Sequence, residues 1–161
     1  MSLERFHKAQ ASRWASYDTA LAEIRAGGKR SHWIWYVFPQ IEGLGRSSAA
    51  RAYAMQDLSE GCAYLRDPLL RARYEEIAAA VSEHLARGIR VEDLMGSQID
   101  ALKLVSSLTL FHAAAEQLAR EDPVYASLAE RLAALLEQTS EQGYPVCDFT
   151  LARIADESSK E

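Results

Sequence analysis

The segment from Lys29 to Gln40 combines groups that bind anions with groups that stack on flat ligands. It reads KRSHWIWYVFPQ, so a Lys, an Arg and a His stand before two Trp, a Tyr and a Phe. Imidazole titrates near neutral pH, which makes His32 a candidate general acid or base. The alternative for His32 is a ring that simply donates to a backbone carbonyl.

The other polar and aromatic residues of this segment are candidate ligand contacts. The indoles of Trp33 and Trp35 could stack on a base or a nicotinamide ring, although large rings more often fill a core. Gln40 could contact an amide or a base edge, or cap a turn. Lys29 could contact a negatively charged group of a ligand, and Ser31 could donate a hydrogen bond to it.

A second candidate is the loop from Glu42 to Ser48, which reads EGLGRSS and precedes a short predicted helix. Glycines followed by an Arg and two Ser at a helix start suit an oxyanion or a phosphate. Arg46 and Ser47 are therefore candidate ligand-binding residues. The loop is neither a P-loop nor a dinucleotide fingerprint, and the alternative is a turn followed by an ordinary serine cap.

The third candidate is the polar face of the helix predicted to start near Ser97. Asp100, Lys103 and Ser107 are three and four residues apart, so they share a face, with Ser106 next to it. Asp100 and Lys103 are candidate catalytic residues, and the two serines are candidate ligand contacts. The alternative is a surface ion pair, with serine hydroxyls bonded to carbonyls of their own helix.

Composition favours one folded domain over residues 1–161, with residues 156–161 expected to fray. No apolar run reaches the ~18 residues of a membrane span, and we expect a cytoplasmic protein without membrane contact. No motif indicates a metal site or a cofactor, and Cys62 and Cys147 form no CxxC pair. No pattern indicates an oligomeric state.

Charge is distributed unevenly along the chain. The net charge is −5, which argues against general binding of duplex nucleic acid. Residues 1–50 nevertheless carry 7 Lys and Arg against 4 Asp and Glu. An anion-attracting surface near the aromatic segment is one interpretation, and a chance variation of solvated faces is the other. Only 4 of the 18 cations are Lys, and Lys29 and Lys103 are the two away from the chain ends.

Helical signals dominate the sequence, and the predicted fold class is all-α, with about seven to nine short and medium helices in an irregular array. HWIWYVF is built from β-formers, but no second strand could pair with it, so a short helix or turn is expected there. Caps, breakers and apolar spacing predict helices over residues 2–10, 16–26, 47–55, 57–65, 67–87, 97–119, 122–138 and 149–155.

Two of these helices carry predictions about the core. The helix that Asp67-Pro68 opens should face inward with Leu69, Ile77, Val81 and Leu85. The helix from Ser97 is apolar nearly all round, which is typical of a central helix.

Several long stretches resemble the domain-of-unknown-function family 1810. They are RFHKAQ, residues 16–55, AYLRDPLL and DALKLVSSLTLF, and they cover nearly the whole chain. The resemblance implies an all-α single domain in bacterial cytosol and implies no established activity. At its end the chain departs from the family, with Cys147 and Asp148 in place of a proline-led turn. The hallmark positions of the family fall on Lys29, Ser31, His32, Trp33, Trp35, Phe38, Pro39, Gln40, Gly43, Gly45, Ser47, Tyr53, Pro68, Lys103, Ser106, Ser107, Thr109 and Phe111.

These observations give one leading hypothesis and two alternatives. The leading hypothesis is a domain that binds a small anionic or nucleotide-like ligand between residues 29–47 and residues 100–109. The first alternative is a hydrolase acting on a nucleotide-type substrate, by general likeness to N-glycosidases of the NADAR type. The second alternative is a non-enzymatic protein-interaction module.

Overall fold

The computed structural model describes residues 3–159, which form one domain of ten α-helices and a single 3-10 turn. The predicted all-α class is confirmed, with ten helices over these residues where about seven to nine were expected. Within that range no strand forms, and the one isolated bridge joins Ile41 and Met55. No described helix is long and apolar enough to cross a membrane. The elements are α1 Glu4–Gln10, α2 Tyr17–Arg25, α3 Ile34–Val37, α4 Ser48–Ala52, α5 Leu58–Arg66, α6 Pro68–Ala86, α7 Val91–Met95, α8 Gln98–Glu121, η1 Pro123–Tyr125, α9 Ala126–Glu141 and α10 Asp148–Ser159.

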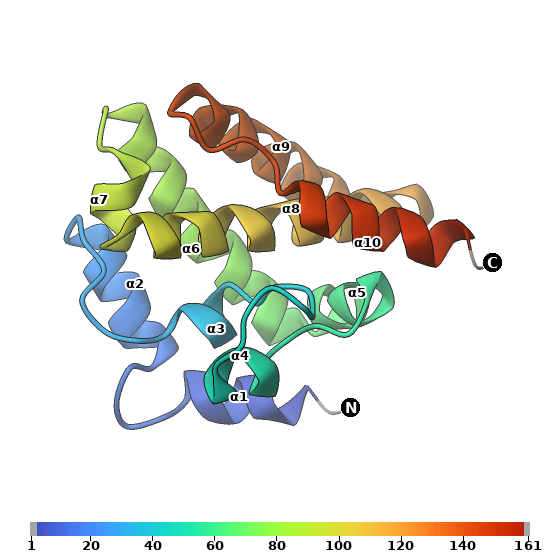
Figure 1. Ribbon diagram of the computed structural model, residues 1–161, viewed down its shortest axis with the longest axis horizontal. Coiled ribbons are helices and arrows are strands. Elements are labelled where there is room, and N and C mark those ends of the chain that lie inside the picture. Colours follow the sequence, from blue (N-terminus) through green and yellow to red (C-terminus); the bar gives the residue numbers. More distant parts are fainter. Residues whose placement is uncertain (1–2, 160–161) are drawn as a thin grey trace.

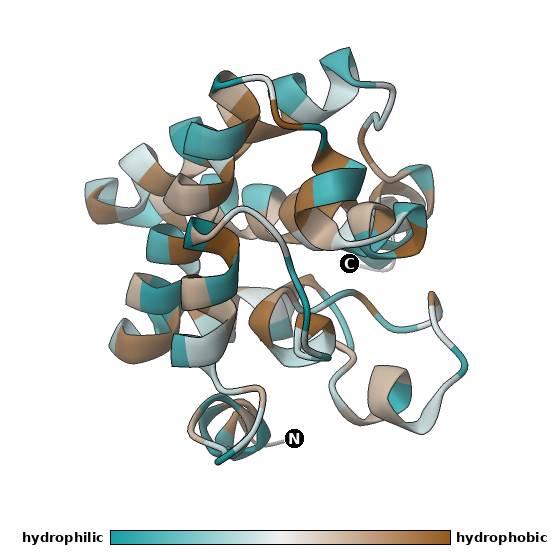
Figure 2. Ribbon diagram, turned by 90° about the vertical axis from the view of Figure 1, so that its left-hand side faces the viewer, coloured by the Kyte–Doolittle hydropathy of each residue, from teal (hydrophilic) through white to brown (hydrophobic). Residues whose placement is uncertain are grey.

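Helix α8 is the central element, as its apolar sequence predicts. It crosses the middle of the molecule in Figure 1 and contacts α3, α5, α7, α9 and α10. Leu104, Leu108 and Phe111 are completely buried, but Ile99 and Leu102 in its first two turns are 66% and 56% exposed. The helix is therefore surrounded over residues 104–111, which are all buried. Figure 2 shows hydrophobic and hydrophilic segments alternating along the surrounding helices, as one-sided burial requires.

Side-chain caps begin most of the helices that the sequence predicts. The Asp67 carboxylate accepts hydrogen bonds from the amides of Leu69 and Leu70, and Pro68 occupies the first helical position. The Ser97 hydroxyl accepts from the amide of Asp100. At Asp122-Pro123 the prediction is wrong, because this pair opens only the 3-10 turn η1 and α9 begins at Ala126.

Three further details differ from the sequence prediction. Leu69 is 46% exposed, because it lies in the first turn of α6 and Leu70 takes the inward position instead; Ile77, Val81 and Leu85 are buried as predicted. The short helix α7 is not predicted. Helix α10 continues past residue 155 to Ser159, and residues 160–161 lie outside the described range.

A cluster of aromatic rings fills the core under the short helix α3. The ring of Tyr74 lies 5.6 Å from Phe38 and 4.6 Å from Phe111, measured between centroids. Tyr64 contacts Phe111 at 5.0 Å. Because these rings come from α5, α6, α8 and the segment after α3, their packing fixes the aromatic segment against the central helix.

Replacing Phe111 by alanine should lower the free energy of unfolding by about 3–5 kcal/mol, because it opens a cavity in this cluster. Leu102→Ala on the same helix is the matched control and should change it by less than ~1 kcal/mol, because that side chain is exposed. Urea denaturation followed by circular dichroism measures both values. Equal losses would contradict the central packing of α8.

Candidate functional site

An ionic cluster joins the aromatic segment to the central helix. The ammonium of Lys29 lies 2.8 Å from Oδ2 of Asp100, and that of Lys103 lies 3.4 Å from Oδ1. The side chain of Lys29 is 6% exposed and that of Asp100 is 17% exposed. We call these three residues the Lys–Asp–Lys cluster. It brings together two segments about seventy residues apart, as the leading hypothesis requires.

The backbone places Lys29 beside helix α8. Gly27 adopts a positive φ of 99° after α2 ends, which lets the chain reverse direction. The amide of Lys29 then donates to the carbonyl of Leu94 in α7 at 2.8 Å. With its backbone held there, the buried ammonium needs a nearby anion, which Asp100 supplies.

Each lysine of the cluster also faces one indole of the aromatic segment. The ammonium of Lys29 lies 5.2 Å from the ring centroid of Trp33, and that of Lys103 lies 5.1 Å from that of Trp35. Both distances suit a cation–π contact. The cluster therefore fixes the two rings as well as the backbone of the segment.

The two indoles differ in whether their ring face and N–H group are available to a ligand. Trp33 is fully buried, and its Nε1 donates to Oε1 of Glu23 at 2.9 Å. It therefore offers no face for stacking on a ligand. Trp35 is partly exposed, and its Nε1 is buried without a hydrogen-bond partner among residues 3–159. A buried N–H without an acceptor is costly, so Trp35 is the indole with a free donor.

Glu23 anchors the start of the segment. Its carboxylate accepts from the amides of Arg30 and Ser31 at 2.8 and 2.9 Å, from the Ser31 hydroxyl and from the Trp33 indole. Partial burial acts in the opposite direction, but these hydrogen bonds together lower the pKa of Glu23 to about 2. The Ser31 hydroxyl thus donates to Glu23. No sequence pattern indicates this contact.

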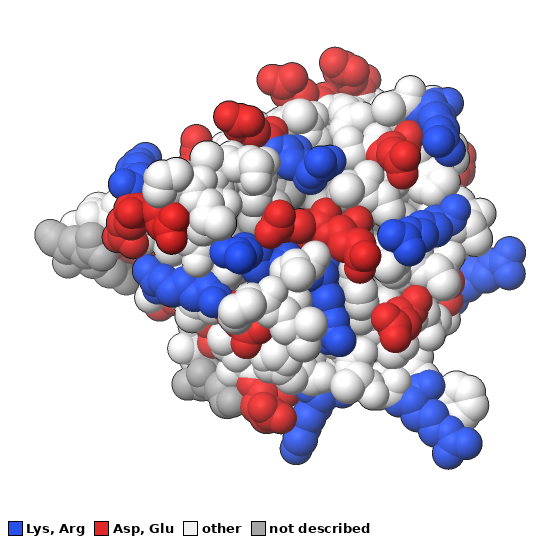
Figure 3. All heavy atoms as spheres, turned by 180° about the vertical axis from the view of Figure 1, so that it is seen from behind, with Lys and Arg blue, Asp and Glu red and all other residues white. Residues whose placement is uncertain are grey.

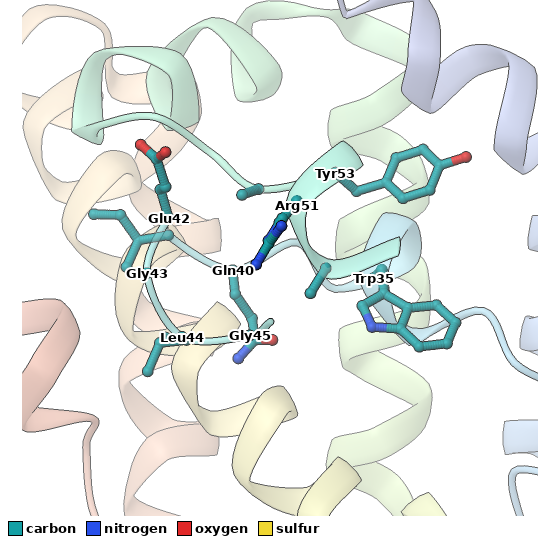
Figure 4. A pocket seen from close by; sticks show the side chains of 11 residues that line it. Trp35, Gln40, Glu42, Gly43, Leu44, Gly45, Arg51 and Tyr53 are labelled. Atoms are coloured by element: carbon teal, nitrogen blue, oxygen red, sulfur yellow. The ribbon is translucent and has the colours of Figure 1, made fainter. Parts of the chain in front are cut away.

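A hollow of about 220 Å³ opens beside Trp35 and is called the Trp35 hollow. Figure 4 shows the nitrogen-bearing edge of Trp35, the amide of Gln40 and the guanidinium of Arg51 directed toward its centre. The carboxylate of Glu42 points away from these groups. The lining residues are Trp35, Gln40, Ile41, Glu42, Gly43, Leu44, Gly45, Ala50, Arg51, Tyr53 and Ala54.

The loop that walls this hollow is held at both ends. The Met55 amide donates to the Gln40 carbonyl at 2.8 Å, and the Glu42 amide donates to the Met55 carbonyl at 2.7 Å. Arg153 of α10 donates to the carbonyl of Glu42 at 2.7 Å. Gly43 has φ of 106°, and a Cβ there would lie 2.8 Å from the ring of Phe149. The GLG sequence therefore serves a tight turn under α10.

Some of the remaining predicted residues of the aromatic segment and the loop lie outside the Trp35 hollow. His32 is exposed and does not line the Trp35 hollow. Arg46 and Ser47 are exposed and do not line it either; the Ser47 hydroxyl accepts from the amide of Ala50 at 3.1 Å, as an ordinary cap does. Gln40 does line the hollow, and so does Arg51, which sequence reasoning missed. Arg51 is the charged residue of the short helix α4, and that position is its only sequence signal.

The hydroxyls of α8 are used inside the protein. Ser106 donates to the carbonyl of Leu102 at 3.0 Å, and Thr109 donates to that of Val105 at 2.7 Å. The hydroxyl of Ser107 lies 2.9 Å from that of Tyr74 in the core. Both serines are therefore positioned as structural groups. In residues 3–159, no three His, Cys, Asp or Glu side chains are grouped as a metal site needs.

Replacing Glu23 by glutamine should remove a pH-dependent part of the stability. The folded-state pKa near 2 lies below the ordinary 4.5, so the stabilisation is complete above the ordinary pKa and disappears as pH falls toward 2. The difference in unfolding free energy between the wild type and Glu23→Gln should therefore shrink over that range. Urea denaturation at several pH values measures it, with Glu130→Gln at an exposed position of α9 as control. A difference that stays constant down to pH ~2 would contradict the role of Glu23.

Comparison with known proteins agrees with this fold. A family model described as "Protein of unknown function (DUF1810)" matches residues 1–138. A crystal structure of a conserved hypothetical protein from Mycobacterium tuberculosis is similar over 95% of this chain and 96% of that one, with 37% identity and a TM-score of 0.77. Among curated proteins, none matches. The chain is a member of the DUF1810 family of proteins of unknown function.

Proposed function

We propose that the Trp35 hollow binds a small anionic ligand through Trp35, Gln40 and Arg51. The observation that carries the proposal is the buried Nε1 of Trp35, which has no acceptor among the described residues. An unpaired buried donor costs about 1–3 kcal/mol. An acceptor atom of a ligand in the hollow would recover that free energy.

The charges around the hollow favour an anion. Arg51 points into it, and the ammonium of Lys103 lies over the ring of Trp35. Glu42 is the one carboxylate among the lining residues, and it is exposed and turned outward. On the face shown in Figure 3, basic and acidic side chains are interspersed. That pattern supports a small local site better than a broad nucleic-acid surface.

Size and lining restrict the ligand further. A hollow of about 220 Å³ is below the usual range of ~300–1,000 Å³ for drug-sized ligands. Ile41, Leu44 and Ala50 contribute apolar wall, whereas Gln40 supplies both a donor and an acceptor. The ligand class that fits is a small carboxylate or phosphate ester with a short apolar body.

The positions of the candidate catalytic groups favour binding over hydrolysis. Both carboxylate oxygens of Asp100 contact lysines. His32 does not line the hollow, so it is not positioned as an acid or base there. Lys103 contributes charge through its contact with Trp35.

A thermal-shift screen followed by calorimetry tests the proposal, with inorganic phosphate, sugar phosphates, nucleoside monophosphates and small carboxylates as ligands. At least one should raise the melting temperature, because a ligand that binds only the folded state stabilises it. Arg51→Ala should weaken that ligand by roughly 10- to 100-fold, the effect of losing a charged hydrogen bond. Trp35→Phe keeps the ring but removes the N–H and should also weaken binding.

Arg131→Ala, at an exposed position on α9, is the control and should bind as the wild type does. The proposal fails if no compound shifts the melting temperature, or if Arg51→Ala and Trp35→Phe both bind with unchanged affinity. Loss of binding in Arg131→Ala as well would mean that the ligand binds elsewhere.

A further inference from the structure

We propose a second binding site, separate from the Trp35 hollow, that takes a nucleotide unit with its base on Trp14 and its phosphate between Arg13 and Arg30. These residues line another hollow, of about 570 Å³, called the Trp14 hollow. It shares no lining residue with the Trp35 hollow. Its lining residues are Arg13, Trp14, Ala15, Thr19, Arg30, Ser31 and His32.

Trp14 presents its ring to solvent. The residue is 77% exposed, more than any other large apolar residue in the described range. The Arg13 guanidinium lies 5.6 Å from its ring centroid. A base stacked on this indole would therefore carry its phosphate close to the Arg13 guanidinium.

The loop that carries Trp14 is held in one conformation. Ala15 has φ of 51°, a left-handed value that is unfavourable for a residue with a Cβ. The hydroxyl of Tyr36 donates to the carbonyl of Ala15 at 2.6 Å, and the hydroxyl of Ser12 donates to that of Trp14 at 2.5 Å. The Ser16 hydroxyl then caps α2 through the amide of Thr19. A strained backbone conformation that several hydrogen bonds maintain is typical of functional positions. Here this conformation holds the Trp14 indole outside the core.

The cations of this hollow are not neutralised within the protein. Across residues 3–159, Arg13, Arg30 and His32 form no ion pair with a carboxylate, and no Asp or Glu lines the hollow. The nearby carboxylate of Glu23 accepts hydrogen bonds from the backbone amide of Arg30 and from the amide and hydroxyl of Ser31. The hollow is therefore free to take an anion.

The combination selects a nucleotide rather than a bare anion. Phosphate alone would use the guanidinium groups, but it has no flat surface to stack on the exposed ring of Trp14. A base gives that indole a flat surface to stack on, and the hydroxyl of Thr19 and the ring of His32 can bond to a sugar or base edge. The nucleotide unit could be free or part of a single strand, and the two sources present the same chemistry.

Fluorescence and calorimetric titrations test the site with AMP, UMP, adenosine, inorganic phosphate and a ten-nucleotide oligo-dT. AMP, UMP or the oligonucleotide should quench Trp14 emission, and Trp14→Ala should weaken that binding roughly 10-fold or more, the effect of losing one stacked base. Trp14→Phe should keep part of the affinity. The double variant Arg13→Ala/Arg30→Ala should weaken binding and reduce its salt dependence.

Trp14→Ala separates this site from the first, because Trp14 lines the Trp14 hollow and not the Trp35 hollow. Arg131→Ala, at an exposed position of α9, is the control and should bind these nucleotides as the wild type does. Binding of AMP or UMP identifies free nucleotides as the source, and binding of oligo-dT alone identifies a single strand. The proposal is overturned if neither binds, if Trp14→Ala binds the nucleotides unchanged, or if Trp14→Ala weakens the binding of inorganic phosphate as much as that of the nucleotides.

Discussion

The carboxylate of Asp100 lies between two ammonium groups that come from different parts of the chain. Lys29 is almost entirely removed from solvent, and an ammonium in that position is tolerated only with an anion beside it. The ion pair therefore forces the segment after α2 against the first turn of α8. The capping motif at Ser97 is also affected. Its serine caps the helix, while the Asp100 carboxylate turns to the lysines.

The arrangement of the aromatic segment follows from this attachment. Helix α3 places Tyr36 and Val37 on the buried side, and its N-cap residue Trp33 is buried as well. Trp35 lies on the other side of the helix, at the rim of a hollow. Lys29 contacts the inner indole and Lys103 the outer one. The sequence allowed these rings either to fill the core or to contact a ligand. In the structure one segment does the first with Trp33 and leaves a free N–H donor on Trp35.

Much of the fold could be predicted from local signals in the sequence. Helix caps and glycine stops act on neighbouring residues, so the sequence alone predicts the helix ends at Asp67-Pro68, Ser97 and Gly27. The same kind of signal failed at Asp122-Pro123, where a 3-10 turn intervenes. Helix α7 has five residues and no side-chain cap, so no sequence signal marks it.

The candidate site was less predictable because it depends on long-range contacts. Polarity and spacing identified Lys29, Asp100 and Lys103, and they do meet. The serines of α8 could not be assigned, because a serine that bonds its own helix and a serine that lines a cleft have the same sequence. Arg51 and Glu23 were missed because their roles come from partners that only the fold brings near.

A double-mutant cycle on Lys29 and Asp100 tests most directly whether this ion pair holds the two segments together. Lys29→Met, Asp100→Asn and the double variant would be compared by urea denaturation, with an equivalent cycle on Lys103 and Asp100 as reference. The buried pair should show a coupling of about 2 kcal/mol or more. The more exposed pair within α8 should stay below ~1 kcal/mol. Additive losses at Lys29 and Asp100, with no coupling, would contradict the central role of the pair.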